Sequence, residues 1–183
     1  LAQAWAILSG VALAPLPLEG EGAGGEGDLP RSEQVLHAME KHLIDREVGI
    51  IRLLTPAFDK TPHDPGYIKG YVPGIRENGG QYTHAALWVV RALAELGRRD
   101  RAAAILERLS PVWHGGTRRR AAVYQVEPYV VAADVYSVAP HVGRGGWTWY
   151  TGSSGWMYRV AIESILGLRV EDGGTLVIKP RVP

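Results

Sequence analysis

The chain has 183 residues, a formal net charge of +1 and no cysteine. That length is enough for one modest domain with a core, and 46% hydrophobic with 21% charged residues is typical of a soluble globular protein. The small net charge argues against a nucleic-acid partner, and the lack of cysteine excludes disulfides, thiolate catalysis and Cys-ligated zinc. No apolar run approaches the ~20 residues that span a bilayer, so we expect a cytoplasmic chain.

Hydrophobic spacing and capping residues predict a mainly helical chain. Apolar residues recur at helical spacing in several segments, each bounded by a capping residue, a glycine or a proline. Ser32 and Asp100 are expected N-caps, Pro111 is expected to end the fourth helix, and Pro128 to start the fifth. The first expected helix begins at Leu1 and stops at Gly10, and the others cover residues 33–44, 81–96, 101–109, 127–136 and 157–166.

The remaining segments are expected to be loops, one short extended piece at 50–54, and a C-terminal hairpin. Residues 13–31 are rich in Pro, Gly and Glu, a composition that predicts a flexible surface insertion. Residues 55–80 form a long Pro/Gly loop, and a loop of this length in a compact domain is usually functional or disordered. After Gly167, residues 168–178 surround a glycine turn and predict a β-hairpin.

The most informative stretch is residues 145–156, which read GGWTWYTGSSGW and predict a glycine-rich loop before a helix. Free N–H groups in the first turn of that helix could receive an anion, and the aromatic rings suit the faces of a sugar. Spacing alone also permits a tightly packed corner that binds no ligand.

Four blocks carry a resemblance to a known family. They are WTWYTGSSGWMYR at 147–159, RENGGQYTHA at 76–85, VEPYV at 126–130 and ILGLR at 165–169. Together, and in this order, they resemble the inverting disaccharide phosphorylases of glycoside hydrolase family 94. The sequences at 64–71 (DPGYIKGY) and 131–137 (VAADVYS) are most similar to the cyclic β-1,2-glucan synthase branch of that family.

The resemblance implies an (α/α)6 barrel followed by a β-rich piece. We expect residues 1–167 to form about the C-terminal half of such a barrel, with 13–31 inserted, and residues 168–183 to begin the β-rich piece. The first residue, a leucine inside a helical pattern, suggests a piece of a longer protein. The rest of that polypeptide is then a partner, the parent is expected to be associated with the inner membrane, and a homodimer is left open.

The resemblance also assigns the site residues. It implies that His84, Thr151 and Gly152 bind inorganic phosphate, which is a co-substrate, and that no other cofactor is needed. Without the resemblance, the residues favour a satisfied core histidine at His84 and leave Glu77 and Glu127 open between helix-capping carboxylates and carboxylates that face a cleft. The sugar-binding residues that we expect are Lys69, Tyr71, Arg76, Glu77, Gln81, Glu127, Trp147, Trp149 and Tyr150. The other histidines, His37, His42, His63, His114 and His141, lack ligand spacing, so we expect no metal site.

The implied reaction is inverting phosphorolysis of β-linked glucosides, in particular β-1,2-glucan, to glucose 1-phosphate. Phosphate replaces the activated water, so a single carboxylic acid suffices. In the family this acid is an aspartate in a Trp-Asn-Asp-Gly block, which this sequence lacks, so the chain by itself is expected to be inactive. Two alternatives stay open: a non-catalytic region that binds glucan or controls its length, and an inverting hydrolase with Glu77 or Glu127 as base.

Overall fold

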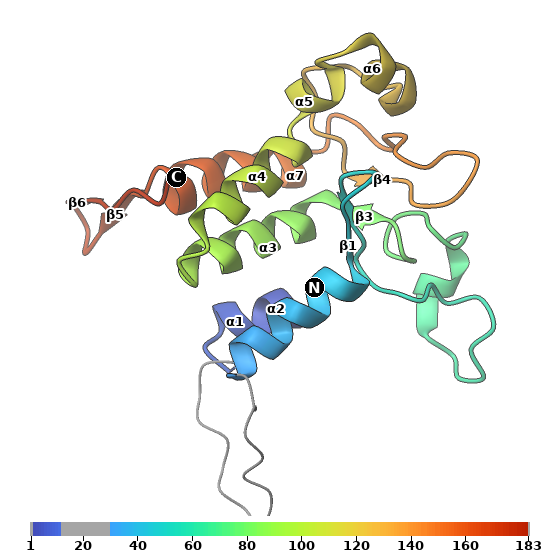
Figure 1. Cartoon of the computed structure of the whole chain (residues 1–183), viewed down its shortest axis with the longest axis horizontal. Helices are drawn as coiled ribbons and strands as arrows, with labels where there is room; N and C mark the ends of the chain where they lie inside the picture. Colours follow the sequence, from blue (N-terminus) through green and yellow to red (C-terminus); the bar gives the residue numbers. More distant parts are fainter. Residues whose placement is uncertain (1, 12–29, 183) are drawn as a thin grey trace, which may run out of the picture.

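The computed structural model describes residues 2–11 and 30–182, which fold into a mainly helical structure (Figure 1). The elements are, in chain order, α1 (Ala2–Leu8), α2 (Arg31–His42), β1 (Ile44–Asp45), β2 (Ile50–Ile51), the 3-10 helix η1 (Gly66–Gly70), β3 (Gln81–Tyr82), α3 (Thr83–Glu95), α4 (Arg99–Leu109), α5 (Pro111–Gly115), α6 (Arg118–Tyr124), β4 (Asp134–Val135), α7 (Thr151–Arg159), the π-helix η2 (Val160–Ile165), β5 (Leu168–Glu171) and β6 (Thr175–Ile178).

Helix α3 is the centre of the core. It is buried along most of its length, and its alanines let the neighbouring helices approach closely. Helices α1, α4 and α7 and the π-helix η2 all pack against it. The main cluster of buried apolar side chains accordingly joins α1, α2, α3, α4 and η2, with Leu87, Val90 and Leu93 at most 1% exposed.

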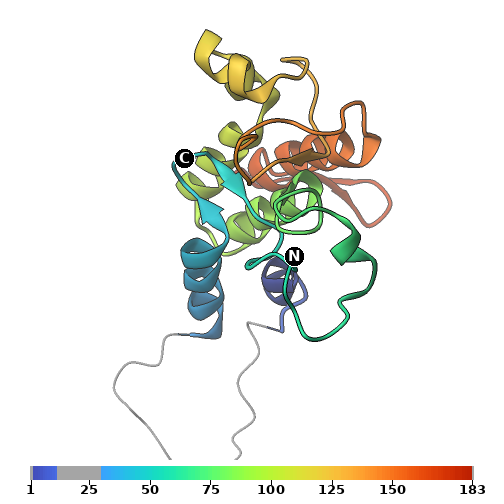
Figure 2. The same cartoon turned by 90° about the vertical axis from the view of Figure 1, so that its right-hand side faces the viewer.

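Helices α3 and α7 run in the same direction, with their N-termini at one end of the molecule. Figure 1 shows both helices beginning near β3 and β4, and the view in Figure 2 looks onto that end, where the long loops gather. At the opposite end, Glu95 of α3 pairs with Arg169 of β5 and with Arg181, which follows β6. The loops therefore sit at the N-terminal end of two parallel helices.

Three two-stranded antiparallel pairs complete the fold: β1 with β2, β3 with β4, and β5 with β6. The pair β3–β4 matters most, because it places Tyr82 opposite Asp134 and joins segments far apart in the sequence. The expected C-terminal hairpin is present, with Leu168 opposite Ile178.

The long loop over residues 55–80 is ordered by one buried amide. Asn78 is fully buried; its Oδ1 accepts from Phe58 N at 2.7 Å, and its Nδ2 donates to the carbonyls of Phe58 and Tyr71. On the other side, Ser137 Oγ donates to Gly79 O at 2.8 Å. These bonds close the loop on itself and tie it to the segment after β4.

The helix predicted over 127–136 is wrong. Its backbone bonds reach other segments instead of the preceding turn: Thr83 N donates to Ala133 O at 2.8 Å, and Ala133 N donates to Trp147 O at 2.6 Å. Residues 132–135 are all buried, as suits a short strand enclosed on both faces. The pairing with β3 thus overrides the first-turn signal of Pro128.

Two short helices were not predicted. Pro111 starts α5 instead of only ending α4, because Ser110 Oγ accepts from Val112 N and caps the new helix. Thr117 Oγ1 likewise accepts from Arg120 N and caps α6.

Helix α7 begins at Thr151, six residues before the predicted start at Met157. Its first turn is rich in glycine and serine, which are weak helix formers. Ser153 compensates, since its buried Oγ donates to Tyr150 O at 3.0 Å and to Val131 O at 3.3 Å.

The predicted insertion over residues 13–31 lies almost entirely outside the described residues. Residues 13–29 of the predicted insertion lie outside the described residues, and Arg31, its last residue, already belongs to α2.

Within residues 2–11 and 30–182, no helix is both long and apolar enough to cross a membrane.

His114 is a buried titratable group away from the loops. Its ring stacks on Tyr124 with centroids 4.3 Å apart and planes 8° apart, and the residue is 6% exposed. Burial, assisted by the charge of Arg120, lowers the pKa of His114 from 6.5 to about 4. The folded state thus disfavours the imidazolium.

Burial of His114 should make the free energy of unfolding decrease as the pH falls. A histidine with a lowered pKa in the folded state contributes fully above the unfolded value of 6.5 and loses that contribution as the pH falls toward 4. We expect His114 to account for about 2 kcal/mol of lost unfolding free energy between pH 7.5 and pH 5. Urea unfolding of His114→Gln should show a correspondingly weaker pH dependence, whereas the exposed control His141→Gln should not; equal slopes in all three would contradict the assignment.

Candidate functional site

The N-termini of α3 and α7 bring His84 and Gly152 together. A Cβ atom placed on Gly152 would lie 3.8 Å from His84 Nδ1 and 3.5 Å from Cε1 of Tyr150. His84 lies in the first turn of α3, and Gly152 in the first turn of α7. Thr151, the first residue of α7, is exposed, and no side chain caps this helix. An imidazole therefore faces a helix N-terminus that lacks a side-chain cap.

His84 is held between aromatic rings. Its ring meets Tyr82 edge-on with centroids 4.4 Å apart and Trp88 at 5.1 Å. Partial burial lowers the pKa of His84, and the nearby carboxylate of Glu77 only partly opposes this shift. Because the ordinary value of 6.5 is already below neutrality, His84 is mainly neutral at pH 7 and offers one N–H donor.

The turn before β3 carries a strained arginine. Arg76 adopts φ +47°, a left-handed conformation that is uncommon for a side chain other than Gly, Asn or Asp. Its guanidinium lies 4.3 Å from the ring centroid of Trp147 and 5.4 Å from that of Tyr71. Arg76 Nε is 3.5 Å from Glu77 Oε2, and both side chains are mostly buried. This turn thus brings Tyr71, Arg76, Glu77 and Trp147 into one cluster.

A second group of expected residues lies along the loop before α7. Trp149 Nε1 donates to Glu127 Oε1 at 3.0 Å, and Trp149 meets Tyr129 edge-on with centroids 6.2 Å apart. Glu127's own backbone N–H, and then Trp149, lower the pKa of the half-buried Glu127, which stays ionised at neutral pH. The indoles of Trp147 and Trp149 are both more than half exposed.

Two expected sugar-binding residues, Lys69 and Gln81, belong to neither of these two groups. Lys69 lies on η1 and pairs with Asp64 at 2.7 Å, at the exposed tip of the long loop. Gln81 is 1% exposed, and its Oε1 accepts from Ile51 N at 2.9 Å, so its side chain supports β2 from inside.

The structure adds two residues that sequence reasoning missed. Tyr82 stands beside His84, and burial, with smaller contributions from Tyr150 and Glu77, raises the pKa of its hydroxyl. Asp134 is fully buried opposite Tyr82 and close to Arg76. A signal for Asp134 was present in the sequence, because a lone carboxylate stands in the otherwise apolar run 130–135.

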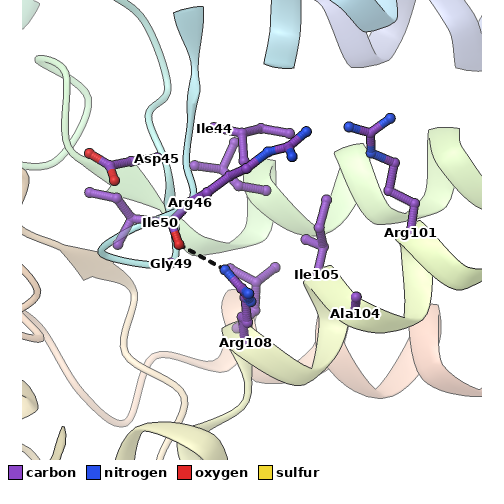
Figure 3. A pocket seen from close by; sticks show the side chains of 11 residues that line it. Ile44, Asp45, Arg46, Gly49, Ile50, Arg101, Ala104, Ile105 and Arg108 are labelled. Carbon is purple, nitrogen blue, oxygen red and sulfur yellow. Dashed lines mark hydrogen bonds between the residues drawn. The ribbon is translucent and has the colours of Figure 1, made fainter. Parts of the chain in front are cut away.

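A hollow of about 320 Å³ lies elsewhere, between the hairpin β1–β2 and α4 (Figure 3). Isoleucines form much of its lining, with arginines around them, and Arg108 donates to the backbone carbonyl of Arg46. None of the expected phosphate- or sugar-binding residues lines it. The chemistry suggested by the sequence blocks gathers at the loop end instead.

Comparison with known proteins identifies the family of the chain. The catalytic domain of the glycosyl hydrolase 94 superfamily matches residues 19–167. The chain belongs to this family. It is similar to the cyclic beta-(1,2)-glucan synthase NdvB of Rhizobium meliloti (strain 1021), with 49% identity over 183 residues, which is all of this chain and 6% of that protein.

Other relatives are phosphorylases. The N,N'-diacetylchitobiose phosphorylase of Vibrio proteolyticus is 32% identical over 156 residues, 84% of this chain and 18% of that enzyme. The solabiose phosphorylase of Paenibacillus borealis is 29% identical over 188 residues, 99% of this chain and 21% of that enzyme. The chain thus spans about a fifth or less of the length of these relatives.

The tight turn that carries Arg76 should not accept a side chain at Gly80. A Cβ there would lie 2.8 Å from Arg76 N and 2.9 Å from Arg76 O, both backbone atoms. We expect Gly80→Ala to lower the free energy of unfolding by about 1–3 kcal/mol. Gly70→Ala is the control, because a Cβ on Gly70 meets nothing within 4 Å, and it should stay within about 0.5 kcal/mol. Equal urea midpoints for the two variants would contradict the described turn.

Proposed function

We propose that this chain is part of a carbohydrate phosphorylase module that cleaves β-linked glucosides, in particular β-1,2-glucan, by inverting phosphorolysis to glucose 1-phosphate. The parent would be a cyclic β-1,2-glucan synthase-like protein. The observation that carries the proposal is the position of His84 beside the first turn of α7, where a Cβ on Gly152 would lie 3.8 Å from His84 Nδ1; the family of the chain supports it.

Phosphate would bind between His84 and α7. A neutral imidazole donates one N–H, while the first-turn N–H groups of α7 and its dipole attract an anion. Thr151 adds an exposed hydroxyl at the same end. Gly152 matters because the gap beside His84 Nδ1 stays open only without a side chain.

The sugar would bind beside the phosphate. Glu77 and Arg76 are the proposed partners of its hydroxyls, and Trp147 with Tyr71 frames the Arg76 guanidinium. Glu127, Trp149 and Tyr150 would form the second wall, where exposed indoles can stack on sugar faces. The proposal gives Lys69 and Gln81 no sugar contact, because Lys69 pairs with Asp64 at the exposed tip of the loop and the buried Gln81 accepts from Ile51 N.

In the proposed reaction, a phosphate oxygen attacks the anomeric carbon from the face opposite the glycosidic oxygen. The C–O bond to the leaving sugar breaks, and a carboxylic acid protonates the leaving oxygen, so the configuration inverts. No aspartate here follows Trp-Asn, so the acid would come from the rest of the parent polypeptide. That polypeptide would also complete an (α/α)6 barrel of which residues 1–167 form part, with residues 168–183 beginning a β-rich piece.

The first test is phosphate dependence in the full-length parent. We expect glucose 1-phosphate from β-1,2-glucooligosaccharides only when phosphate is added, with inversion visible by NMR. Because a hydrogen bond to a charged group contributes about 1.5–3 kcal/mol, His84→Ala should lower kcat/KM for phosphate by about 10- to 100-fold. The exposed His141→Ala is the control. Sugar release by water alone would support a hydrolase, and oligosaccharide binding without turnover would support the glucan-binding alternative.

A second test uses two glycines of α7. Both Gly152→Ala and Gly155→Ala should favour the helix, since alanine is a better helix former than glycine by about 1 kcal/mol. Only the methyl group on residue 152 would enter the gap beside His84, because a Cβ on Gly155 meets nothing within 4 Å. We expect Gly152→Ala to raise the KM for phosphate about tenfold or more and Gly155→Ala to leave it unchanged. Equal effects on KM would overturn the phosphate assignment.

A further inference from the structure

We infer that Asp134 is a positioning residue of the proposed sugar site, a buried carboxylate that fixes the Arg76–Glu77 turn against the Gly146–Trp147 turn. Its effect on sugar binding rests on the proposed function. Its effect on the two turns does not.

Asp134 lies at the junction of the segments that build the site. It belongs to β4 and faces Tyr82 of β3 in the antiparallel register. Its backbone carbonyl accepts from Gly146 N at 2.8 Å, and its Oδ1 accepts from Trp147 N at 3.1 Å. The loop that carries Trp147 is therefore bound to both the backbone and the side chain of this one residue.

The carboxylate fills the space that Gly146 leaves. A Cβ on Gly146 would lie 2.4 Å from Asp134 Oδ1 and 2.7 Å from Oδ2, far inside van der Waals contact. Asp134 has no exposed surface, so it cannot touch a bound sugar directly. The close fit explains why a glycine stands before Trp147 and argues for a structural contact aimed at the loop.

Arg76 supplies the charge that a buried carboxylate needs. Burial raises the pKa of Asp134, whereas the bond to Trp147 N–H and the charge and backbone N–H of Arg76 lower it; Glu77 adds repulsion. A buried ionised group costs several kcal/mol unless it is paired. Among the described residues, Asp134 Oδ2 and Arg76 Nε make no hydrogen bond and no ion pair joins the two side chains, so Arg76 acts on the carboxylate through its charge over a longer distance.

The carboxylate of Asp134 also bears on the conformation of Arg76. Its backbone is strained at φ +47°, and its guanidinium covers Trp147. A negative charge near both the Arg76 backbone and the Trp147 amide holds these two in place together. Asp134 would thereby preorganise Arg76, Glu77 and Trp147 for a sugar before the sugar arrives.

The test is Asp134→Asn in the full-length parent, a substitution that keeps the shape and removes the charge. Because hydrogen bonds to charged groups contribute more than neutral ones, we expect hydrogen exchange of the Trp147 amide to rise about tenfold, read from peptides covering 145–149. The KM for a β-1,2-glucooligosaccharide should rise about tenfold, while the KM for phosphate should stay within about twofold, since His84 and Gly152 do not touch Asp134.

Asp45→Asn is the matched control. Asp45 also accepts from a backbone N–H, that of Val48 at 3.1 Å, and pairs with an arginine, Arg52 at 2.8 Å, but it lies on β1 outside the site. It should change neither KM. Gly146→Ala is the second variant, because its methyl group would displace the same carboxylate and should reproduce the faster exchange and the higher sugar KM even if Asp134→Asn misfolds.

The outcomes separate the two proposals. Unchanged Trp147 exchange and unchanged sugar KM in both variants overturn the role of Asp134. Equal rises in the KM values for sugar and phosphate also overturn it, because they indicate general loosening. If the unmodified parent cleaves no glucan, the proposed function fails, and the exchange measurement alone still decides whether Asp134 fixes the Trp147 turn.

Discussion

The short pairing of β3 with β4 is the constraint on which the site depends. Two residues on each side, Gln81–Tyr82 and Asp134–Val135, join the turn before α3 to the loop before α7. Bonds from Thr83 N to Ala133 O and from Ala133 N to Trp147 O extend this junction in both directions. Isolated strands of this length are not stable. The pair persists because α3 is anchored in the core and because buried side chains on both strands leave little room for another register.

A layer of buried polar side chains surrounds this junction, and each member ties a loop to a rigid element. Asn78 closes the loop over 55–80, Gln81 holds β2, and Ser153 starts α7. Such groups are costly to bury without partners, so their hydrogen bonds specify the loop conformations strongly. The unusual feature is the concentration of strain and charge at Arg76, where a left-handed backbone, a carboxylate on either side and two aromatic rings meet. Strain of this kind persists only where the surroundings over-determine it, and it is common at binding sites.

Sequence patterns predicted the helices and turns whose conformation depends on neighbouring residues. The amphipathic period of α3 and the glycine turn of β5–β6 are properties of adjacent residues, and both elements are present. The segment 127–136 failed because its partners, Thr83 and Trp147, are distant in the sequence. Helix α7 was placed too late because its glycines and serines are weak helix formers, and packing of Trp156 and Met157 against the core compensates. For the site, the residues alone favoured a core histidine at His84. Its position beside Gly152 comes from two helices whose parallel packing no local pattern encodes.

The distribution of charge also bears on which nucleophile this site suits. An inverting hydrolase needs a carboxylate free to take a proton from water. Glu127 is bonded to Trp149, and its lowered pKa makes it a weak base. Glu77 is paired with Arg76, whose Nε lies 3.5 Å from Glu77 Oε2. Beside His84 the local features favour an anion instead: a helix N-terminus without a side-chain cap, a glycine that leaves room, and an imidazole that can donate one N–H. A bound phosphate would also offset the lowered pKa of His84, because its negative charge favours the imidazolium, and a charged donor makes a stronger hydrogen bond. Attraction of the anion and strengthening of its donor would therefore reinforce each other at this position.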